Sequence, residues 1–587
     1  MDSLNGVHLP PATTPRHLGD LLAFIEAKAP CGQPRAGEMA SAIRSFASWT
    51  GLSSDHIPTD MPVIRRHWSK LKASIVRVSP GRFANVKSLL NRALVMAGVK
   101  PLNRPVAEVL TVSWSGLFAI LTDRYLRSSL APFARFCMTT GVEPEDVSDE
   151  VTDRYRQHLE LVAMVKKPET THQTVCRTWN AARTKFPSWP AVTLTVPNRT
   201  DHYVLPQADF PQAFQDEVEA YLRRLGSNEP ADLLDEFAPV RPLRKASIVI
   251  KLFQIRQFAS ALVHTGTSLD RIDSLAVLTE LANFKQGLRF MLGRPRDPNC
   301  SKTAGYMATT ILAIAKHHVK LGEQEIALLS VVTSNLNTHT PGMTDKNLRR
   351  VAQMNDPAVL ANFLSFAQSR MSALLKQKSM SRIEAAQFSI CLAHDILIHA
   401  PMRVSNLARL RLDTQIHLPQ SGAGETVVLV PSSETKGRST QQHLLQPETT
   451  EFVLLYLSRV RPIIDDRRLP WLSPNGRGHH KRPDTVSKQL SALILDNLGL
   501  EYSPHLQRHL TARIKADATP GDMESIRLLL GHASIETTAR FYTGLQTNGA
   551  SRSYSDLIRA KRQQIPDGEE GPGKWNAVKR RKPKSKG

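Results

Sequence analysis

The chain has 587 residues, of which 76 are Lys or Arg and 53 are Asp or Glu, so its net charge is +23. That length predicts several domains, and an apolar content of 41% excludes wholesale disorder. The charge predicts a polyanionic partner. No apolar stretch reaches the roughly 18 residues of a membrane span, and the N-terminus lacks a basic-then-apolar signal pattern. We therefore expect a cytoplasmic protein that binds nucleic acid and no membrane.

Cysteine spacing argues against a local metal motif. None of the five cysteines lies within four residues of another, which excludes a CxxC-type zinc knuckle. We expect reduced thiols, most of them buried. The sequence predicts neither a metal site nor a cofactor.

The N-terminal part is mostly amphipathic helix, and one pattern recurs in residues 43–57, 133–147 and 258–272. In each segment an apolar residue stands eight positions before a Gly, Thr precedes the Gly, and another apolar residue follows six positions after it. A helix that ends at a left-handed Gly and turns into a new segment explains this pattern. Although Gly ends many helices, agreement at several positions favours three related helical modules. Their uneven spacing indicates duplication rather than a solenoid.

Polar stretches that contain proline indicate the domain boundaries. We predict a mainly α, multidomain chain: helical modules over residues 1–105 and 106–200, a linker over 201–235, a third helical module over 236–343, a mixed α/β domain over 344–558, and a disordered basic tail over 559–587. The tail suits non-specific phosphate contact, and a solvated charge run explains it equally well.

In the C-terminal third, residues 386–412 predict two helices that break at Pro401, the second carrying Arg403. Residues 425–447 hold two short apolar stretches around a polar turn, which predicts a β-hairpin. Lys436 lies in that turn. This part of the chain is therefore a small sheet among helices.

Two further helices complete this region. His505 and Arg508 are three positions apart near a helix start, so they share one helix face. A later apolar helix ends at Gly531 and is followed by His532 and, after a turn, by a segment that ends in Tyr542.

Six polar residues of these elements suit phosphodiester transfer: Arg403, Lys436, His505, Arg508, His532 and Tyr542. Two guanidiniums can hold the nonbridging oxygens of a phosphate and stabilise a pentacoordinate transition state. The lysine can protonate a leaving 5′ oxygen, and the histidines can bind phosphate or take the proton of the nucleophile. A tyrosine hydroxyl can attack and leave a phosphotyrosine. Such cations replace metal ions, so no cofactor is needed.

Taken singly, each of these residues has an ordinary structural explanation. A helical arginine often forms a surface ion pair, a histidine often fills a core, and a lysine in a turn is usually solvated. The six residues in this order, each on a fitting element, favour the catalytic interpretation.

These segments resemble the tyrosine recombinase, or phage integrase, family over about residues 346–550. APMRVSNLARLRL is similar to the first arginine box of the family, and SETKGR to the hairpin with the catalytic lysine. PHLQRH is similar to the His-x-x-Arg box, and LLGHASIETTARFYTG to the last box. The resemblance implies a catalytic set of Arg403, Lys436, His505, Arg508 and His532, with Tyr542 as the nucleophile.

The chain departs from the family pattern at three points. Asn406 stands where an acid is frequent, and Leu506 and Gln507 replace a frequent Asp-Leu pair. Tyr542 follows His532 by ten positions, where nine is commoner. None of these changes removes a catalytic side chain.

The resemblance also implies an activity and partners. A core-binding helical domain, for which the third module is our candidate, would clamp double-stranded DNA against the catalytic domain. Four protomers would act on two DNA sites through a 3′-phosphotyrosyl link and a Holliday junction, alone or with sister recombinases or an accessory factor. The long N-terminal region favours an integrase or transposase of a mobile element, acting at the nucleoid of a prokaryotic host.

Two alternatives stay open. One is a type IB topoisomerase-like or hairpin-telomere-forming enzyme with the same chemistry. The other is a catalytically silent DNA-binding partner that keeps the fold.

Overall fold

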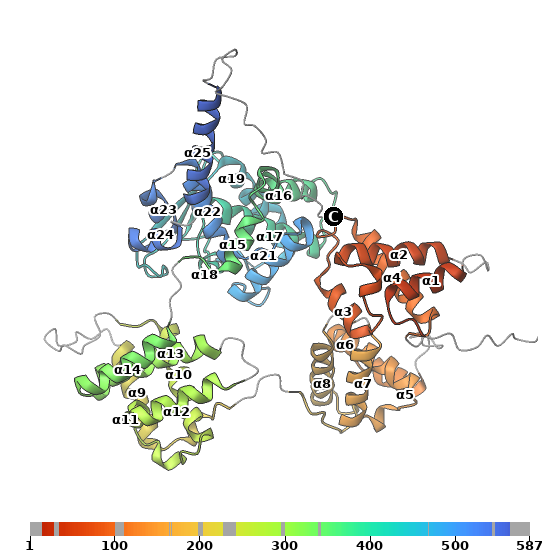
Figure 1. Cartoon of the computed structure of the whole chain (residues 1–587), viewed down its shortest axis with the longest axis horizontal. Helices are drawn as coiled ribbons and strands as arrows, with labels where there is room; N and C mark the ends of the chain where they lie inside the picture. The colour runs from red at the N-terminus through yellow and green to blue at the C-terminus, as the bar shows by residue number, and fades with distance from the viewer. Residues whose placement is uncertain are drawn as a thin grey trace, which may run out of the picture. The chain divides into compact units, whose positions relative to one another are not determined.

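The computed structural model describes residues 14–28, 35–99, 111–163, 165, 167–197, 203–226, 242–294, 300–337, 342–467, 469–519, 521–542 and 546–563, with backbone alone at 300, 540–542 and 546–553. The chain forms two compact units (Figure 1). One unit comprises Met1–Thr195 and Pro341–Gly587, and the other is Val196–Thr340.

Residues 14–99, here called the first module, are helical. The elements are α1 (Leu18–Lys28), α2 (Ala36–Thr50), the 3-10 helix η1 (Ser54–His56), α3 (Met61–Lys70) and α4 (Pro80–Met96). Ser79 caps α4 by accepting a hydrogen bond from the backbone N–H of Arg82, at 3.2 Å. Ile43, Phe46 and Leu90 are fully buried in the core that the helices share.

Residues 111–197, the second module, are also helical. The elements are α5 (Val112–Ala119), α6 (Arg124–Thr139), the 3-10 helix η2 (Pro144–Asp146), α7 (Asp149–Leu161) and α8 (Pro168–Lys185). Trp179 is fully buried between Trp114, at 6.4 Å between ring centroids, and Phe133, at 6.2 Å. These edge-to-face contacts fix three helices around one aromatic centre.

The second unit holds the third module, residues 203–337. Its elements are η3 (Gln207–Asp209), α9 (Gln212–Gly226), α10 (Lys245–His264), η4 (Leu269–Arg271), α11 (Leu275–Thr279), α12 (Leu281–Leu292), α13 (Cys300–Ile314), the π-helix η5 (Ala315–Val319) and α14 (Glu323–Leu336). Among the described helices, α10 is long and apolar enough to span a membrane by length and composition. Its Ile255, Phe258 and Leu262 are fully buried in the module's core, as in the central helix of a globular domain.

The predicted linker over residues 201–235 is wrong for its described part. Residues 203–226 include α9, and Phe214, Val218 and Tyr221 of α9 are buried in the same core as α10. Three apolar side chains at helical spacing supply the buried face, which the flanking prolines obscured in the sequence. The other domain boundaries stay predictions.

The three repeated segments adopt one succession of elements. In each, a helix is followed by a glycine of positive φ, which is 72° at Gly51, 69° at Gly141 and 104° at Gly266. A short 3-10 helix (η1, η2 or η4) comes next, and then a buried apolar residue, Ile57, Val147 or Ile272. Because a left-handed conformation favours glycine, the backbone explains the residue that recurs.

Residues 342–563 form the C-terminal domain. Its helices are α15 (Asp345–Ala352), α16 (Pro357–Leu375), α17 (Arg382–His399), α18 (Val404–Ala408), α19 (Pro447–Leu455), the π-helix η6 (Tyr456–Val460), α20 (Arg461–Ile464), α21 (Pro483–Leu498), α22 (Pro504–Ala518), α23 (Met523–Leu530), α24 (Ile535–Tyr542) and α25 (Gln546–Gln563). Its strands are β1 (Ile416–His417), β2 (Thr426–Val430) and β3 (Gln441–Leu445).

The strands form one antiparallel sheet in the order β1-β2-β3. The predicted hairpin is confirmed, since Thr426 pairs with Leu445 and Val430 with Gln441. Val428 and Leu445 are fully buried with α17 residues such as Phe388 in the main core of this domain. The expected fold class, helical modules followed by a mixed α/β domain with a small antiparallel sheet, is therefore observed.

The predicted basic tail begins later than expected. Residues 559–563 belong to α25, which packs against α22, so the helix extends beyond the boundary placed at residue 558. The rest of the predicted tail, residues 564–587, lies outside the described residues.

Candidate active site

Arg403 occupies the break between α17 and α18. Pro401 prevents α17 from continuing, because a residue before proline disfavours the helical conformation. Ala400 and Met402 are fully buried and anchor the break in the core. Arg403 then stands at the N-cap position of α18 with a half-buried side chain. The break thus places a guanidinium at the edge of the main core.

Lys436 lies in the turn that joins β2 to β3, and its side chain is exposed. Thr435 beside it is buried and donates a hydrogen bond to the carbonyl of Ser439 at 2.7 Å, which closes the turn. A Cβ on the neighbouring Gly437 would lie 3.1 Å from the carbonyl oxygen of Gly531. The turn therefore packs directly against the end of α23, one residue before His532.

Arg508 connects two of these elements. Its side chain is 4% exposed and extends from α22. Its Nη1 donates to the carbonyl oxygen of Pro401 and its Nη2 to that of Leu530, each at 2.6 Å. One guanidinium thereby holds the α17–α18 break and the end of α23 to the same face of α22, and it remains a fixed positive charge there.

The predicted histidines lie around the two arginines. The ring of His505 is 5.0 Å from that of His509 between centroids. Loss of solvation, followed by the charges of Arg508 and Arg403, lowers the pKa of His505. The same causes, in the same order, lower the pKa of His532 to about 4. Both imidazoles therefore favour the neutral form more than a solvated histidine does.

His532 is also held in a defined orientation. Its Nδ1 lies 3.0 Å from the hydroxyl of Thr538, which is fully buried in α24. Its backbone carbonyl accepts a hydrogen bond from Arg527 Nη1 at 3.1 Å. The contact with Thr538 fixes the orientation of the imidazole ring.

Three residues that the sequence did not single out surround Arg508. Gln441 and His443 point inward from β3, and His509 follows Arg508 on α22. Burial lowers the pKa of His443 to about 4, and the charge of Arg508 adds to this effect. Burial likewise lowers the pKa of His509 to about 4, with further effects of His505, Arg508 and His532. The alternation of the strand could have indicated the inward residues of β3.

The structure thus gathers five of the six predicted residues. Arg403, His505, Arg508 and His532 interact electrostatically, and Lys436 lies in the turn that packs beside His532. Tyr542 is the last residue of α24, and its side chain lies outside the described residues. Within the described part of the chain, no group of three or more His, Cys, Asp or Glu residues is arranged to hold a metal ion.

An arrangement of two guanidiniums, several imidazoles and a nearby lysine is suited to one phosphodiester group. Residues 366–548 match the phage integrase family. These residues form a phage integrase domain. The match includes all six predicted catalytic positions and contains the sheet and α17 to α24.

Known proteins resemble part of this chain. The protein y4qK of Sinorhizobium fredii, named as an integrase/recombinase, is 30% identical over 171 residues, which cover 29% of this chain and 53% of y4qK. Tyrosine recombinase XerC of Alcanivorax borkumensis is 28% identical over 179 residues, which cover 30% of this chain and 53% of XerC. The chain therefore spans about half the length of these curated relatives.

Solved recombinase structures are more distant. XerH bound to its difH substrate has 15% sequence identity and a TM-score of 0.33, over 61% of this chain and 90% of XerH. Lambda integrase residues 75–356 bound to a core site have 13% identity and a TM-score of 0.33, over 57% of this chain and 95% of that structure. At such scores the domain assignment rests on the family match and the sequence relatives.

Proposed function

We propose that the chain is a site-specific DNA recombinase, an integrase or transposase of a mobile element, that cuts and rejoins double-stranded DNA through a 3′-phosphotyrosyl intermediate. The observation that carries this proposal is the convergence of Arg403, His505, Arg508 and His532 with the Lys436 turn. Four cationic or proton-accepting side chains around one point, with a lysine at its edge, match the charge of a scissile phosphate.

Each side chain has a role in this proposal. The two arginines bind the nonbridging oxygens and stabilise the extra charge of the pentacoordinate transition state. Tyr542 attacks phosphorus, His505 or His532 accepts the phenolic proton, and Lys436 donates a proton to the leaving 5′ oxygen. The reverse sequence, with a 5′ hydroxyl of another strand as the nucleophile, rejoins the DNA.

We further propose a tetramer that binds two DNA sites and passes through a Holliday junction. The third module would contact DNA as the core-binding domain, directly before the catalytic domain in the chain. Sister recombinases or an accessory factor are possible partners of the assembly.

Covalent trapping on a nicked suicide substrate made from the ends of the element tests the chemistry. Wild type should give a slow-migrating protein–DNA adduct, and Tyr542→Phe should give none while it still binds the DNA. An adduct that survives in Tyr542→Phe would assign the attack to another tyrosine. Tight binding without an adduct in either protein would favour a silent DNA-binding partner, and relaxation of plasmids that lack a target site would favour a topoisomerase-like enzyme.

A further inference from the structure

The first module carries an unusual distribution of charge in its second half. Residues 61–99 contain eight Lys or Arg residues and no Asp or Glu. The corresponding stretch of the second module, residues 149–197, contains seven Lys or Arg residues and five Asp or Glu. Two modules with the same succession of elements therefore differ sharply in charge, so the shared fold does not require the basic stretch.

All eight cations lie in α3, in α4 or in the loop between them. Arg66, Lys70, Arg77 and Arg82 have exposed side chains. Arg66 and Lys70 are one helical turn apart and share a face of α3. Contact between the rings of Trp68 and Phe83, at 5.0 Å between centroids, holds α3 beside the first turn of α4, which carries Arg82.

Few of the eight cations are neutralised. Lys72 pairs with Asp496 at 2.7 Å, and Arg65 donates to the backbone carbonyls of Leu159 and Glu160. Four of the exposed cations, Arg66, Lys70, Arg77 and Arg82, have no carboxylate of the described residues within ion-pair distance. Unpaired exposed cations create a positive surface potential, which attracts a polyanion.

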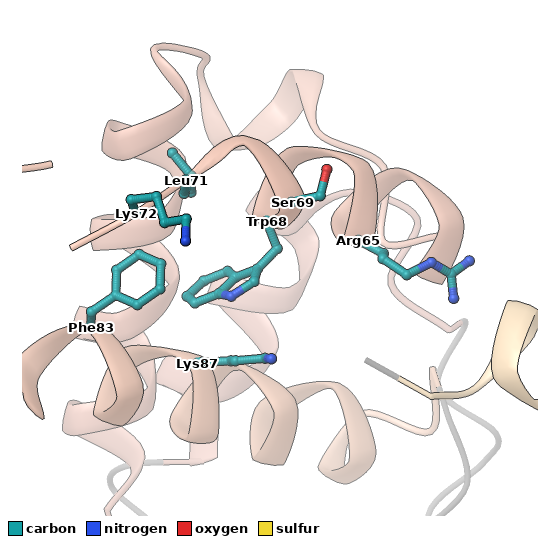
Figure 2. A pocket seen from close by; sticks show the side chains of 7 residues that line it. All are labelled: Arg65, Trp68, Ser69, Leu71, Lys72, Phe83 and Lys87. Carbon is teal, nitrogen blue, oxygen red and sulfur yellow. The ribbon is translucent and has the colours of Figure 1, made fainter. Parts of the chain in front are cut away.

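The hollow between α3 and α4 is too small for a typical small-molecule ligand (Figure 2). It has a volume of about 180 Å³ and is lined by Trp68, Phe83, Lys72 and Lys87, among others. This volume is below the roughly 300 Å³ at which small-molecule pockets begin. In Figure 2 the Phe83 and Trp68 rings lie beside each other between the two lysines. The ligand of this surface is therefore inferred from its positive charge and not from the shape of the hollow.

The aromatic rings also disfavour single-stranded nucleic acid. Trp68 is 9% exposed, and its ring packs on Phe46 at 5.2 Å as well as on Phe83. Base stacking requires an accessible ring face, and these faces already contact one another. Phosphate contact by flexible exposed cations suits the backbone of a duplex instead.

We infer that residues 61–99 form a second DNA-binding surface, which contacts the phosphates of double-stranded DNA separately from the catalytic site and from the third module. The inference goes beyond the proposed recombinase chemistry and does not depend on it. Arg66, Lys70, Arg77 and Arg82 are the residues that contact phosphate, and the surface reads no base sequence. The neutral second module makes no equivalent contact.

The test compares two full-length proteins in the Tyr542→Phe background, so that strand cleavage plays no part. One carries Arg66→Gln, Lys70→Gln, Arg77→Gln and Arg82→Gln. The matched control carries Arg124→Gln, Arg127→Gln, Arg135→Gln and Arg177→Gln, four exposed arginines of the second module. Binding of a fluorescent duplex of mixed sequence is measured over a series of salt concentrations.

The first variant should lose affinity, and the slope of log K against log salt should become shallower by roughly 3 to 4, at about 0.9 per phosphate contact. The control should keep the parental slope. A charge-preserving variant, Arg66→Lys with Arg77→Lys and Arg82→Lys, should also keep it, and thermal unfolding checks that each protein is folded.

Several results would overturn the inference. If both variants keep the parental slope, or if both lose affinity equally, the first module is not a distinct DNA-binding site. Stronger competition by single-stranded DNA than by a duplex of equal length would reject the duplex as its ligand. The binding assay does not involve cleavage by Tyr542. A negative trapping result would therefore disprove the proposed chemistry without affecting the test of this surface.

Discussion

Gln441 of β3 donates a hydrogen bond from Nε2 to the backbone carbonyl of Leu530 at 3.2 Å. The same carbonyl accepts Arg508 Nη2 at 2.6 Å. The hairpin that carries Lys436 and the helix that carries Arg508 are therefore joined at one oxygen atom, directly before Gly531 and His532. This junction is the structural basis for expecting the hairpin, α22 and α23 to act as one site.

Gly531→Ala should disrupt that junction. Gly531 has a φ of 60°, and an added Cβ would overlap the amide of Gln441, at 1.3 Å from Nε2. Left-handed alanine costs about 1 kcal/mol, and displacement of a buried amide adds about 1 kcal/mol more. We expect a loss of about 2 kcal/mol in the free energy of unfolding, measured by urea denaturation, together with slower covalent trapping.

Gly521→Ala is the matched control for this prediction. Gly521 lies in the same domain with a φ of 90°, and nothing lies within 4 Å of its added Cβ. Its substitution should cost only the backbone strain and leave trapping at the wild-type rate. If both variants behave alike, the contact with Gln441 has no role in the site.

Lys436→Met should slow DNA cleavage, with a loss of about 10²- to 10⁴-fold, because the leaving 5′ oxygen loses its proton donor. A substrate with a sulfur atom in the 5′ bridging position should restore the rate, since a thiolate leaves without protonation. Arg403→Gln should be equally slow and should stay slow with the sulfur substrate, because a guanidinium acts on the nonbridging oxygens. Single-turnover cleavage measures both. Failure of the sulfur to rescue Lys436→Met would remove Lys436 as the acid.

The local elements of this site could be predicted from the sequence, and their junctions could not. Two short apolar stretches around a polar turn identified the β2–β3 hairpin, and Pro401 identified the helix break before Arg403. The contact of Gln441 with Leu530 joins residues 89 positions apart, so no periodicity encodes it. The helix α9 was missed because flanking prolines outweighed its apolar spacing, and the buried position of His443 follows from the alternation of β3 only once the register is known.

Asn406→Leu should stabilise the domain. Asn406 is 6% exposed, and its Nδ2 has no hydrogen-bond partner among the described residues, although Oδ1 accepts from the hydroxyl of Ser405 at 3.2 Å. Leucine has a similar shape and lacks the unsatisfied amide, so the substitution should raise the free energy of unfolding by about 1 kcal/mol. Gln441→Leu is the contrasting variant, because its amide is bonded to Leu530 and its loss should destabilise. A loss of stability in Asn406→Leu would show that the amide has a partner that matters.

His443→Leu should reduce the pH dependence of stability. The folded-state pKa of His443 is about 4, below the ordinary 6.5, because of burial and the nearby charge of Arg508. A histidine with a depressed pKa gives its full stability above about pH 6.5, and that stability is lost as the pH falls toward 4, since the unfolded chain takes up the proton first.

Between those two pH values the wild type should therefore lose up to about 3 kcal/mol more than His443→Leu, at about 1.4 kcal/mol per pKa unit. Urea denaturation at a series of pH values measures the difference, and NMR titration of the ring protons of His443 measures its pKa directly. Parallel stability curves for the two proteins would mean that His443 titrates as in the unfolded chain. The environment of Arg508 would then admit a charged imidazole, and the neutral state inferred for the histidines around it would be wrong for this residue.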